Sequence, residues 1–481
     1  MIVKENLQKL SPVLWQIPKN FRSDMNVDAK IFASQEMLDE ILNDRSLEQI
    51  VNVATLPGVI GSAYAMPDVH EGYGFPIGGV AATKFPNGVI SPGGIGYDIN
   101  CGVRLLKSNI DINSIKSYLE SLAREIYKRV PSGVGRGSEF VLTITELDQV
   151  LKYGVQWALN KNFATQHDVQ NIESRGRLEN ANPSLVSDHA KKRGLDQLGT
   201  LGAGNHFLEI GFVEQIYDKE IANQFGLFEN QVTILIHTGS RGLGHQVATD
   251  YIKIMMQKMY DYGIQVPDRE LVCAPFNSTE GQNYFDAMAA SANFAWTNRQ
   301  MITYAVRQGW KKELGLLGGE LELLYDVAHN IAKIETHEFE GKNKKVIVHR
   351  KGATRAFPPN HPDLPPQYQK TGQPVLIPGS MGTASYVLAG TQTGMTASLG
   401  STCHGAGRKM SRHAAKKEIH GKALKTELEK EGIIIRTGSI PGLAEEAPAA
   451  YKDIDEVVQV VYMAGIAKKI ARLRPCVVIK G

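Results

Sequence analysis

The 481-residue sequence has few cysteines and no long apolar run. Its cysteines, which are Cys101, Cys273, Cys403 and Cys476, form no C-x-x-C pair, and a chain of this length does not need disulfides for stability. We therefore expect a reducing, cytoplasmic compartment. The segment 1–19 has no uninterrupted apolar stretch, and no window of about 18 apolar residues occurs anywhere, so we expect neither a signal peptide nor a membrane span.

Other signals are missing as well. The sequence has no G-x-x-x-x-G-K-[ST] motif, so a nucleoside triphosphate would have to be bound without a Walker loop. It has no internal repeat and no low-complexity linker, and the net charge of +3 permits a polyanionic ligand without requiring one. Glycine, in contrast, is abundant: the 47 glycines exceed the average share of about 7%. This excess indicates irregular loops, in which functional sites are often built.

Helical and extended patterns are intermixed along the chain. Apolar periodicity predicts helices at 112–130, 279–312, 408–431 and 453–473. Short apolar runs predict strands at 232–236, 345–348, 374–377, 432–436 and 476–479. Because no strand–helix alternation repeats, we expect one compact α+β domain with mixed sheets and no internal boundary. Five prolines within 358–366 predict a long surface loop.

A glycine-rich stretch at 91–104 carries the first candidate site. Asp98 and Cys101 lie three positions apart there, among four glycines and a proline. One tight turn with this spacing can direct both side chains at an ion, and a thiolate sulfur can bridge two metals. For these two residues alone, a buried small cysteine beside a turn-forming aspartate explains the pattern equally well.

Three histidines favour the metal interpretation. His206 follows a glycine turn, His237 ends the apolar run 232–236, and His329 precedes Asn330. A satisfied core histidine would explain each one singly, but buried histidine and aspartate need partners, and the group together favours a shared site. One thiolate with imidazoles and a carboxylate suits zinc. Two metals about 3.5–4 Å apart would suit phosphoryl transfer.

The remaining histidines are weaker candidates. His70, in Met-Pro-Asp68-Val-His70, is either a site residue or one half of a structural Asp–His pair. Five others lie in polar surroundings and are expected to be solvated, namely His167, His337, His361, His413 and His420.

The stretch 401–408 carries a candidate nucleophile. His404 is flanked by small residues that would let a phosphate approach closely, and Arg408 can neutralise phosphate charge. A neutral imidazole can attack phosphorus and hold a nucleotidyl group. The alternative is that His404 is a further metal ligand. Its neighbour Cys403 is expected to be buried, because successive side chains of an extended segment point in opposite directions.

Three further segments are suited to phosphate contacts. The small-residue loop 378–385 could offer backbone N–H groups to an anion, although a structural turn has the same composition. The basic stretches 349–355 and 408–412 are solvated surface in the simplest interpretation. Their position beside the phosphate-handling candidates favours contact with an RNA or DNA backbone.

With these residues in view, the sequence resembles the RtcB family of RNA ligases, which join RNA ends in tRNA splicing and RNA repair. The resemblance runs from about Trp15 to Gly481. Its motifs are 66–70, 93–104, 201–209, 237–246, 325–330, 349–358, 378–390 and 401–408. It implies a single RtcB-type catalytic domain over 1–481, with a central cleft for metals and a nucleotide.

The resemblance also implies a role for each matching residue. Asp98, Cys101 and His206 would hold one Mn²⁺ ion, and Cys101, His237 and His329 a second; zinc or cobalt could occupy the same ligands. His404 would be the catalytic nucleophile that carries GMP. Residues implied to line the guanylate pocket are Asn205, His206, Phe207, Leu208, Glu209, His329, Asn330, Pro378, Gly379, Ser380, Met381, Ser385, Gly405, Ala406, Gly407, Tyr451 and Lys480.

The implied reaction uses GTP and RNA. His404 would attack the α-phosphorus of GTP and release pyrophosphate. An RNA 2′,3′-cyclic phosphate would be opened to a 3′-phosphate that takes GMP from His404, and a 5′-hydroxyl would then expel GMP. The implied partners are tRNA halves and an archease-type activator. Two other hypotheses remain: a two-metal phosphodiesterase acting on RNA ends, and a non-catalytic RNA-binding protein, in which Asp98, Cys101 and His404 together would have no purpose.

Overall fold

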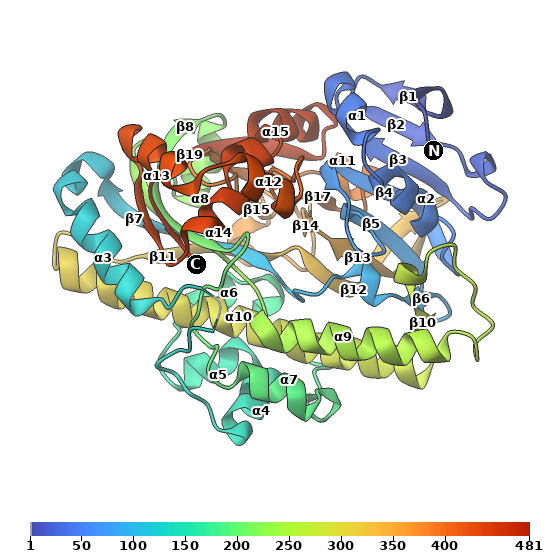
Figure 1. Cartoon of the computed structure of the whole chain (residues 1–481), viewed down its shortest axis with the longest axis horizontal. Coiled ribbons are helices and arrows are strands. Elements are labelled where there is room, and N and C mark those ends of the chain that lie inside the picture. Colours follow the sequence, from blue (N-terminus) through green and yellow to red (C-terminus); the bar gives the residue numbers. More distant parts are fainter. Residues whose placement is uncertain (1, 134) are drawn as a thin grey trace.

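The computed structural model describes residues 2–133 and 135–481 and contains two large β-sheets (Figure 1). The first sheet has seven strands in the order β1-β2-β3-β4-β5-β13-β12. Their bounds are β1 Gln8–Ser11, β2 Leu14–Ile17, β3 Asp28–Phe32, β4 Val59–His70, β5 Ile77–Lys84, β12 Asn330–Phe339 and β13 Lys342–Lys351. Strands β3 and β4 pair in parallel, and the other neighbours in this sheet are antiparallel.

The second sheet has eight strands, seven of them in the order β11-β7-β9-β8-β19-β16-β15, with β18 paired to β19. Their bounds are β7 Gly102–Asp111, β8 Phe207–Ile216, β9 Gln231–Thr238, β11 Glu322–Ala328, β15 Pro374–Ile377, β16 Ser385–Gly390, β18 Ile434–Thr437 and β19 Ala467–Lys480. Every residue of β9 is buried, both its apolar centre and the polar residues at its two ends. Two small sheets pair β6 (Val89–Ile90) with β10 (Ala274–Pro275) and β14 (Ala353–Arg355) with β17 (Ser401–Cys403).

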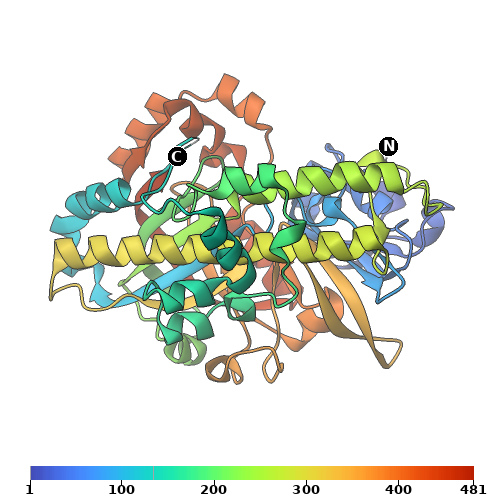
Figure 2. The same ribbon diagram turned by 90° about the horizontal axis from the view of Figure 1, so that it is seen from below.

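Two long helices, α9 (Arg241–Lys258) and α10 (Thr279–Leu314), pack side by side against the sheets (Figures 1 and 2). The Ser278 hydroxyl caps α10 by accepting the Gly281 N–H. Almost all of the middle of α10, residues 287–303, is buried, which its small alanine side chains permit. The shorter helices are α1 Gln35–Ile41, α2 Ser46–Val53, α3 Leu119–Arg129, α4 Ile144–Tyr153, α5 Val155–Asn160, α6 Gln166–Gln170, α7 Asp188–Gly194, α8 Lys219–Phe225, α11 Gln392–Ala397, α12 Arg412–Glu418, α13 Gly421–Lys430, α14 Ile440–Glu445 and α15 Ile454–Met463.

The fold confirms the predicted α+β class and most of the predicted elements. The helix expected at 279–312 is α10, and the strand expected at 374–377 is β15. The helix expected at 112–130 begins only at Leu119, after two short 3₁₀ turns, and the helical region 408–431 is divided between α12 and α13.

The prediction of a helix over 453–473 is wrong beyond Met463, because β19 begins at Ala467. The apolar residues there also fit a helical period, but the segment pairs with β8 on one side and β16 on the other. Residues 467–473 pair with β16, and β8 adds a second partner from Ala471 onward, so strand pairing decides the conformation. Among the described residues, no helix has both the length and the apolar character needed to cross a membrane.

Candidate active site and metal centre

The ends of four neighbouring strands in the second sheet meet at one place. Cys101 directly precedes β7, and His206 directly precedes β8. His237 is the penultimate residue of β9, and His329 directly follows β11. These strands are adjacent in the order β11-β7-β9-β8 and pair antiparallel. The starts of β7 and β8 therefore lie at the same sheet edge as the ends of β9 and β11. Antiparallel pairing thus gathers side chains that are far apart in sequence.

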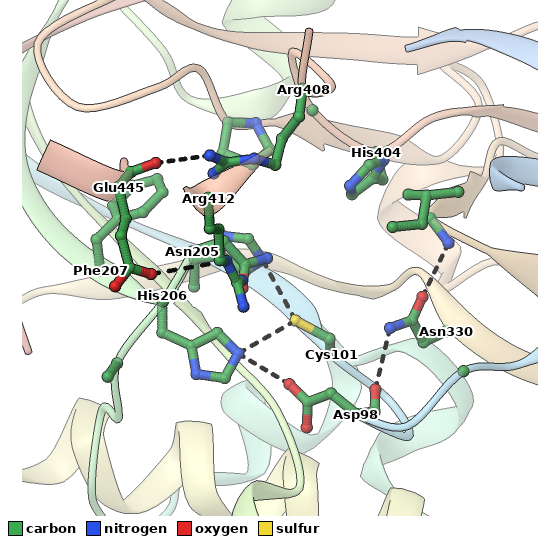
Figure 3. Close-up of a pocket in the computed structure, with 18 of the residues that line it drawn as sticks. Asp98, Cys101, Asn205, His206, Phe207, Asn330, His404, Arg408, Arg412 and Glu445 are labelled. Carbon is green, nitrogen blue, oxygen red and sulfur yellow. Dashed lines mark hydrogen bonds and ion pairs between the residues drawn. The ribbon is translucent and has the colours of Figure 1, made fainter. Parts of the chain in front are cut away.

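The potential ligand atoms have the separations expected around shared ions. Cys101 Sγ lies 3.5 Å from His206 Nε2 and 3.4 Å from His237 Nε2. His237 Nε2 lies 3.3 Å from His329 Nε2, and His206 Nε2 lies 2.8 Å from Asp98 Oδ2 (Figure 3). Atoms that bind one ion at about 2.0–2.3 Å in tetrahedral geometry are themselves about 3.3–3.8 Å apart. The three separations of 3.3–3.5 Å lie in this range, whereas the 2.8 Å between His206 and Asp98 is a hydrogen-bond distance.

Two ligand groups share the sulfur of Cys101. The first ligand group is Asp98, Cys101 and His206, and the second ligand group is Cys101, His237 and His329. Within each group all ligand atoms lie within 4.8 Å of one another. The structure therefore brings together all five residues that were predicted to bind metal.

Burial sets the charge of this cluster. Burial, with the nearby imidazoles, lowers the pKa of His237 and His329 well below the usual value, so both rings are neutral and offer a lone pair. Burial also raises the pKa of the Cys101 thiol, as does the Asp98 carboxylate. A thiolate at this position therefore needs a cation beside it. His206 Nδ1 donates to the Leu201 carbonyl at 3.1 Å, which leaves Nε2 facing the sulfur. This donor set fits two divalent transition metals.

A buried arginine on α10 holds the second ligand group in place. Arg299 Nη1 donates to the carbonyl oxygens of Asn100 and Thr238, both at 2.9 Å. Its other nitrogens bind Asp326 on β11, which also accepts from Arg104 at 2.8 Å. Asn100, Thr238 and Asp326 belong to the three segments that carry this group, so one guanidinium links all three.

His404 stands beside the metal ligands but belongs to neither group. Its ring centroid lies 5.0 Å from that of His329, in an edge-to-face arrangement. Its Nδ1 is hydrogen-bonded to Asp68 Oδ2, and the same oxygen accepts the N–H groups of His404 at 2.8 Å and of Gly405 at 3.3 Å. Burial alone would raise the pKa of Asp68, but the charge and hydrogen bonds of His404 lower it. Nδ1 therefore carries a proton, and in the neutral form of the ring the lone pair is on Nε2.

Sequence reasoning missed this role of Asp68. The motif 66–70 offered a structural pair of Asp68 and His70, whereas His70 Nδ1 lies 2.9 Å from the Asp68 backbone carbonyl and 3.4 Å from the Arg408 backbone nitrogen, and does not contact the Asp68 carboxylate. The Asp68 carboxylate instead accepts hydrogen bonds from His404. Asp68 lies on β4, and β4 packs against β17, which ends at Cys403 just before His404. No sequence signal indicates that contact, since it joins segments more than 330 positions apart. Cys403 is fully buried, as predicted.

One cavity of about 860 Å³ joins His404 to the metal ligands. Its volume is that of a typical small-molecule site. The residues predicted for the guanylate that line it, beyond the metal ligands and His404, are Asn205, Phe207, Asn330, Pro378, Gly405, Ala406, Gly407 and Tyr451. Arg408 also lines it and lies over the Tyr451 ring, with its guanidinium carbon 4.9 Å from the ring centroid.

The other residues predicted for the guanylate do not line this cavity. Leu208 is fully buried and, by strand alternation, faces away from Phe207 and Glu209 into the core on the side of α10. Glu209 is also buried, and its Oε1 has no partner. Burial raises its pKa to about 8 although Lys480, whose Nζ donates to the Gly204 carbonyl at 2.6 Å, opposes this.

The loop predicted to bind an anion uses backbone donors internally. The Gly379 N–H donates to Ser385 Oγ at 3.1 Å, and the Ser380 N–H donates to Thr383 Oγ1 at 2.9 Å. Met381 packs into a small apolar cluster instead. In this conformation, therefore, the loop is a structural turn over these residues.

The basic stretch at 349–355 is not solvated surface. Arg350 is fully buried and donates to both oxygens of Glu335, at 2.6 and 2.9 Å. The same carboxylate binds His337 at 2.9 Å, so His337 is buried too, against expectation. Burial lowers the pKa of Lys351 to about 7, and its Nζ donates to the Phe75 carbonyl at 3.0 Å. Pairing with Glu335 permits the burial of Arg350 and His337, and a carbonyl acceptor permits that of Lys351. The sequence alone does not indicate these partners.

Three aromatic residues of the cavity wall were also missed. Tyr73, Tyr97 and His245 line the cavity on the side of Asp98. Tyr97 directly precedes Asp98 in the motif 93–104, and that adjacency was the available signal.

The buried thiol, imidazoles and carboxylate form a candidate metal centre of an enzyme, beside a histidine that an aspartate orients. Comparison with known proteins agrees, and the chain belongs to the RtcB family: the model described as tRNA-splicing ligase RtcB matches residues 49–481. A protein named tRNA-splicing ligase RtcB from Thermococcus kodakarensis is 53% identical over 477 residues, 99% of each chain. Proteins of the same name from Nanoarchaeum equitans and Archaeoglobus fulgidus are 53% and 50% identical, each also over 99% of both chains. The resemblance to this family is thereby confirmed.

Proposed function

We propose that this protein is a cytoplasmic RNA ligase that acts in tRNA splicing and RNA repair. It joins RNA ends bearing a 2′,3′-cyclic phosphate or 3′-phosphate to 5′-hydroxyl ends, using GTP, two Mn²⁺ ions and a His404–GMP intermediate. The family match and the names of the relatives support the RNA ligase activity.

The orientation of His404 is the observation that carries the mechanism. Asp68 accepts the Nδ1 proton, so the unprotonated Nε2 is the ring nitrogen that remains to attack phosphorus. The attack on the α-phosphorus of GTP forms the Nε2–P bond, breaks the bond to the β-phosphate oxygen and releases pyrophosphate. The imidazole gains positive charge as this bond forms, and the Asp68 carboxylate stabilises that charge. An imidazole held in this way could also act as a general base, so the covalent His404–GMP adduct is the feature that separates the ligase from a phosphodiesterase.

The two ligand groups would hold the metals, with Cys101 as the shared ligand. When bound, such ions stabilise negative charge on the phosphate oxygens during each displacement. The donor atoms alone suit zinc, and the choice of Mn²⁺ follows from the family. Arg408, stacked on Tyr451, adds a fixed cation for phosphate at the end of the cavity where we place the guanylate.

The test begins with α-labelled GTP and Mn²⁺. The wild-type protein should acquire acid-labile label, and His404→Ala should not. The matched control is His413→Ala, which removes an exposed histidine on α12, nine positions away. The labelled protein is then given one RNA fragment ending in a cyclic phosphate and another beginning with a 5′-hydroxyl. Joined RNA and released GMP are expected, and an archease-type activator should raise the turnover.

Two outcomes would overturn the proposal. Label that persists in His404→Ala would show that another residue is the nucleophile. Opening of the cyclic phosphate without joining or label would show the phosphodiesterase activity instead.

A further inference from the structure

The cavity has an aromatic wall that the mechanism above does not use. The ring centroids of Tyr73 and Tyr97 lie 5.4 Å apart in an edge-to-face arrangement. The ring of His245, on α9, lies nearly parallel to that of Tyr97, with centroids 6.1 Å apart and planes inclined by 20°. Both tyrosines are half-buried and His245 is exposed, and all three line the cavity.

Hydrogen bonds fix the segment that presents this wall. The buried Lys351 donates to the carbonyl of Phe75 and to that of Tyr73. The Gly74 N–H donates to Glu270 at 3.0 Å. The backbone at Tyr73 is therefore held by hydrogen bonds, and its ring packs edge-to-face against Tyr97.

Cations accompany the aromatic rings. Arg241, one turn before His245 on α9, also lines the cavity. Arg193 donates to Gln246, the next residue after His245, at 3.1 Å. Aromatic rings beside arginines suit the binding of a nucleotide. The rings can stack on the base, and the guanidinium groups can bind the phosphate.

The position of Tyr97 indicates which nucleotide it meets. In a displacement at phosphorus the entering and leaving oxygens lie roughly in line on opposite sides. The leaving group of the joining step is GMP, which we place at the end of the cavity with Arg408. Asp98, the residue after Tyr97, lies across the cavity from Arg408 (Figure 3). The entering 5′-hydroxyl therefore arrives from the side of Tyr97.

We propose that Tyr97, supported by Tyr73 and His245, forms a stacking platform for the base of the 5′-hydroxyl nucleotide of the RNA. This inference rests on the proposed ligase function. The platform binds the base through its π-face, so it accepts all four bases and orders the end whose hydroxyl attacks. Tyr97 is thus a positioning residue for the joining step.

The test measures binding of a 5′-hydroxyl RNA whose first base is 2-aminopurine, which loses fluorescence when it stacks. Wild-type protein with Mn²⁺ should quench this probe strongly, and should quench it little when 2-aminopurine is the fourth base. Tyr97→Ala should weaken binding about 5- to 150-fold and abolish the quenching, whereas Tyr97→Phe, which keeps the ring, should retain both. Tyr260→Ala, which removes an exposed tyrosine beyond the end of α9, is the matched control.

A second RNA separates stacking from displacement of Asp98. If the first nucleotide is abasic, the base that stacks is gone, and Tyr97→Ala should then change the affinity less than twofold. An equal loss on the abasic and intact RNAs would overturn the proposal, because the substitution would be acting through the metal ligands. Quenching confined to the last base of a 3′-phosphate strand would also overturn it. Binding and quenching do not require GTP, so a failure of the ligase proposal, seen as absent protein labelling, is distinguishable from a failure of the platform.

Discussion

Replacement of Asp68 by asparagine tests how His404 is activated. A single oxygen, Asp68 Oδ2, accepts the His404 Nδ1 proton and two backbone N–H groups, and the other oxygen is buried without a partner. An asparagine must direct its carbonyl oxygen to the three donors, because its amino group would meet them with like polarity. We therefore expect Asp68→Asn to keep the ring orientation and the Nδ1 proton and to remove only the negative charge.

The size of the effect follows from that difference. A hydrogen bond to a charged group contributes about 1.5–3 kcal/mol and a neutral one about 0.5–1.5 kcal/mol. Loss of the charge should therefore raise the barrier to guanylylation by about 1–2 kcal/mol, which slows it about 5- to 30-fold. Asp68→Ala removes the acceptor altogether, so the ring loses both its orientation and its tautomer. Loss of the required tautomer slows an imidazole on the order of 10⁴-fold.

The assay is single-turnover labelling with α-labelled GTP at saturating Mn²⁺. Rates should decrease in the order wild type, Asp68→Asn, Asp68→Ala. Far-ultraviolet circular dichroism and thermal unfolding of each variant show that the fold remains. Metal content should be the same in all three proteins, because Asp68 belongs to neither ligand group.

Two results would refute this reasoning. An asparagine variant as slow as the alanine variant would mean that the amide does not preserve the orientation of His404. An asparagine variant as fast as the wild type would mean that the carboxylate charge plays no part in forming the histidine–GMP bond.

Three further predictions concern the surroundings of the site. Cys101→Ala should lose both metals, seen by elemental analysis, because both ligand groups share its sulfur; loss of one metal alone would contradict the bridge. Arg299→Met should lower metal affinity about 10- to 100-fold in calorimetric titration, because the segments of the second ligand group lose their common donor; Arg307→Met, on the same helix, is the control and should bind metal normally. The folded-state pKa of Glu209 is raised to about 8, so between about pH 5 and pH 8 the folded state binds a proton that the unfolded state releases. The Glu209 contribution to the melting temperature of the metal-free protein therefore falls as pH rises through this range, whereas the buried neutral histidines contribute with the opposite sign. Compared with the wild type, Glu209→Gln should lose this fall, so its slope of melting temperature against pH should be more positive; an unchanged slope would place the titration elsewhere.

Local patterns in the sequence predicted much of the fold. The helix α10 and the strands β9 and β15 follow from apolar periodicity and short apolar runs, because these elements satisfy their own hydrogen bonds or lie fully in the core. The segment 467–473 was predicted as helix, and tertiary pairing made it the start of β19. The periodicity of apolar residues does not show which strands a segment will pair with in the folded protein.

The ligand set was predictable because its residue types are unusual, whereas the supporting contacts were not. A thiol, a carboxylate and three imidazoles next to glycine turns indicate metal binding even when the distances between them are unknown. The pairing of Asp68 with His404, and the burial of Arg350 by Glu335, depend on segments that meet only after folding. Sequence reasoning therefore treated Arg350 by its average behaviour, which is to face solvent, and paired Asp68 with its neighbour His70.

The position of His329 links the candidate metal ligands to His404. This one residue connects β11 of the second sheet to β12 of the first, so it belongs to the junction of the two sheets. Its N–H donates to the Cys101 carbonyl at 2.9 Å, and its carbonyl accepts the Ala353 N–H at 3.1 Å. Ala353 begins β14, whose partner β17 ends just before His404. Backbone hydrogen bonds across a single packed junction thus connect the candidate metal ligands to the segment that carries His404. The candidate metal ligands and His404 therefore already line one cavity in this structure, and substrates have to enter that cavity.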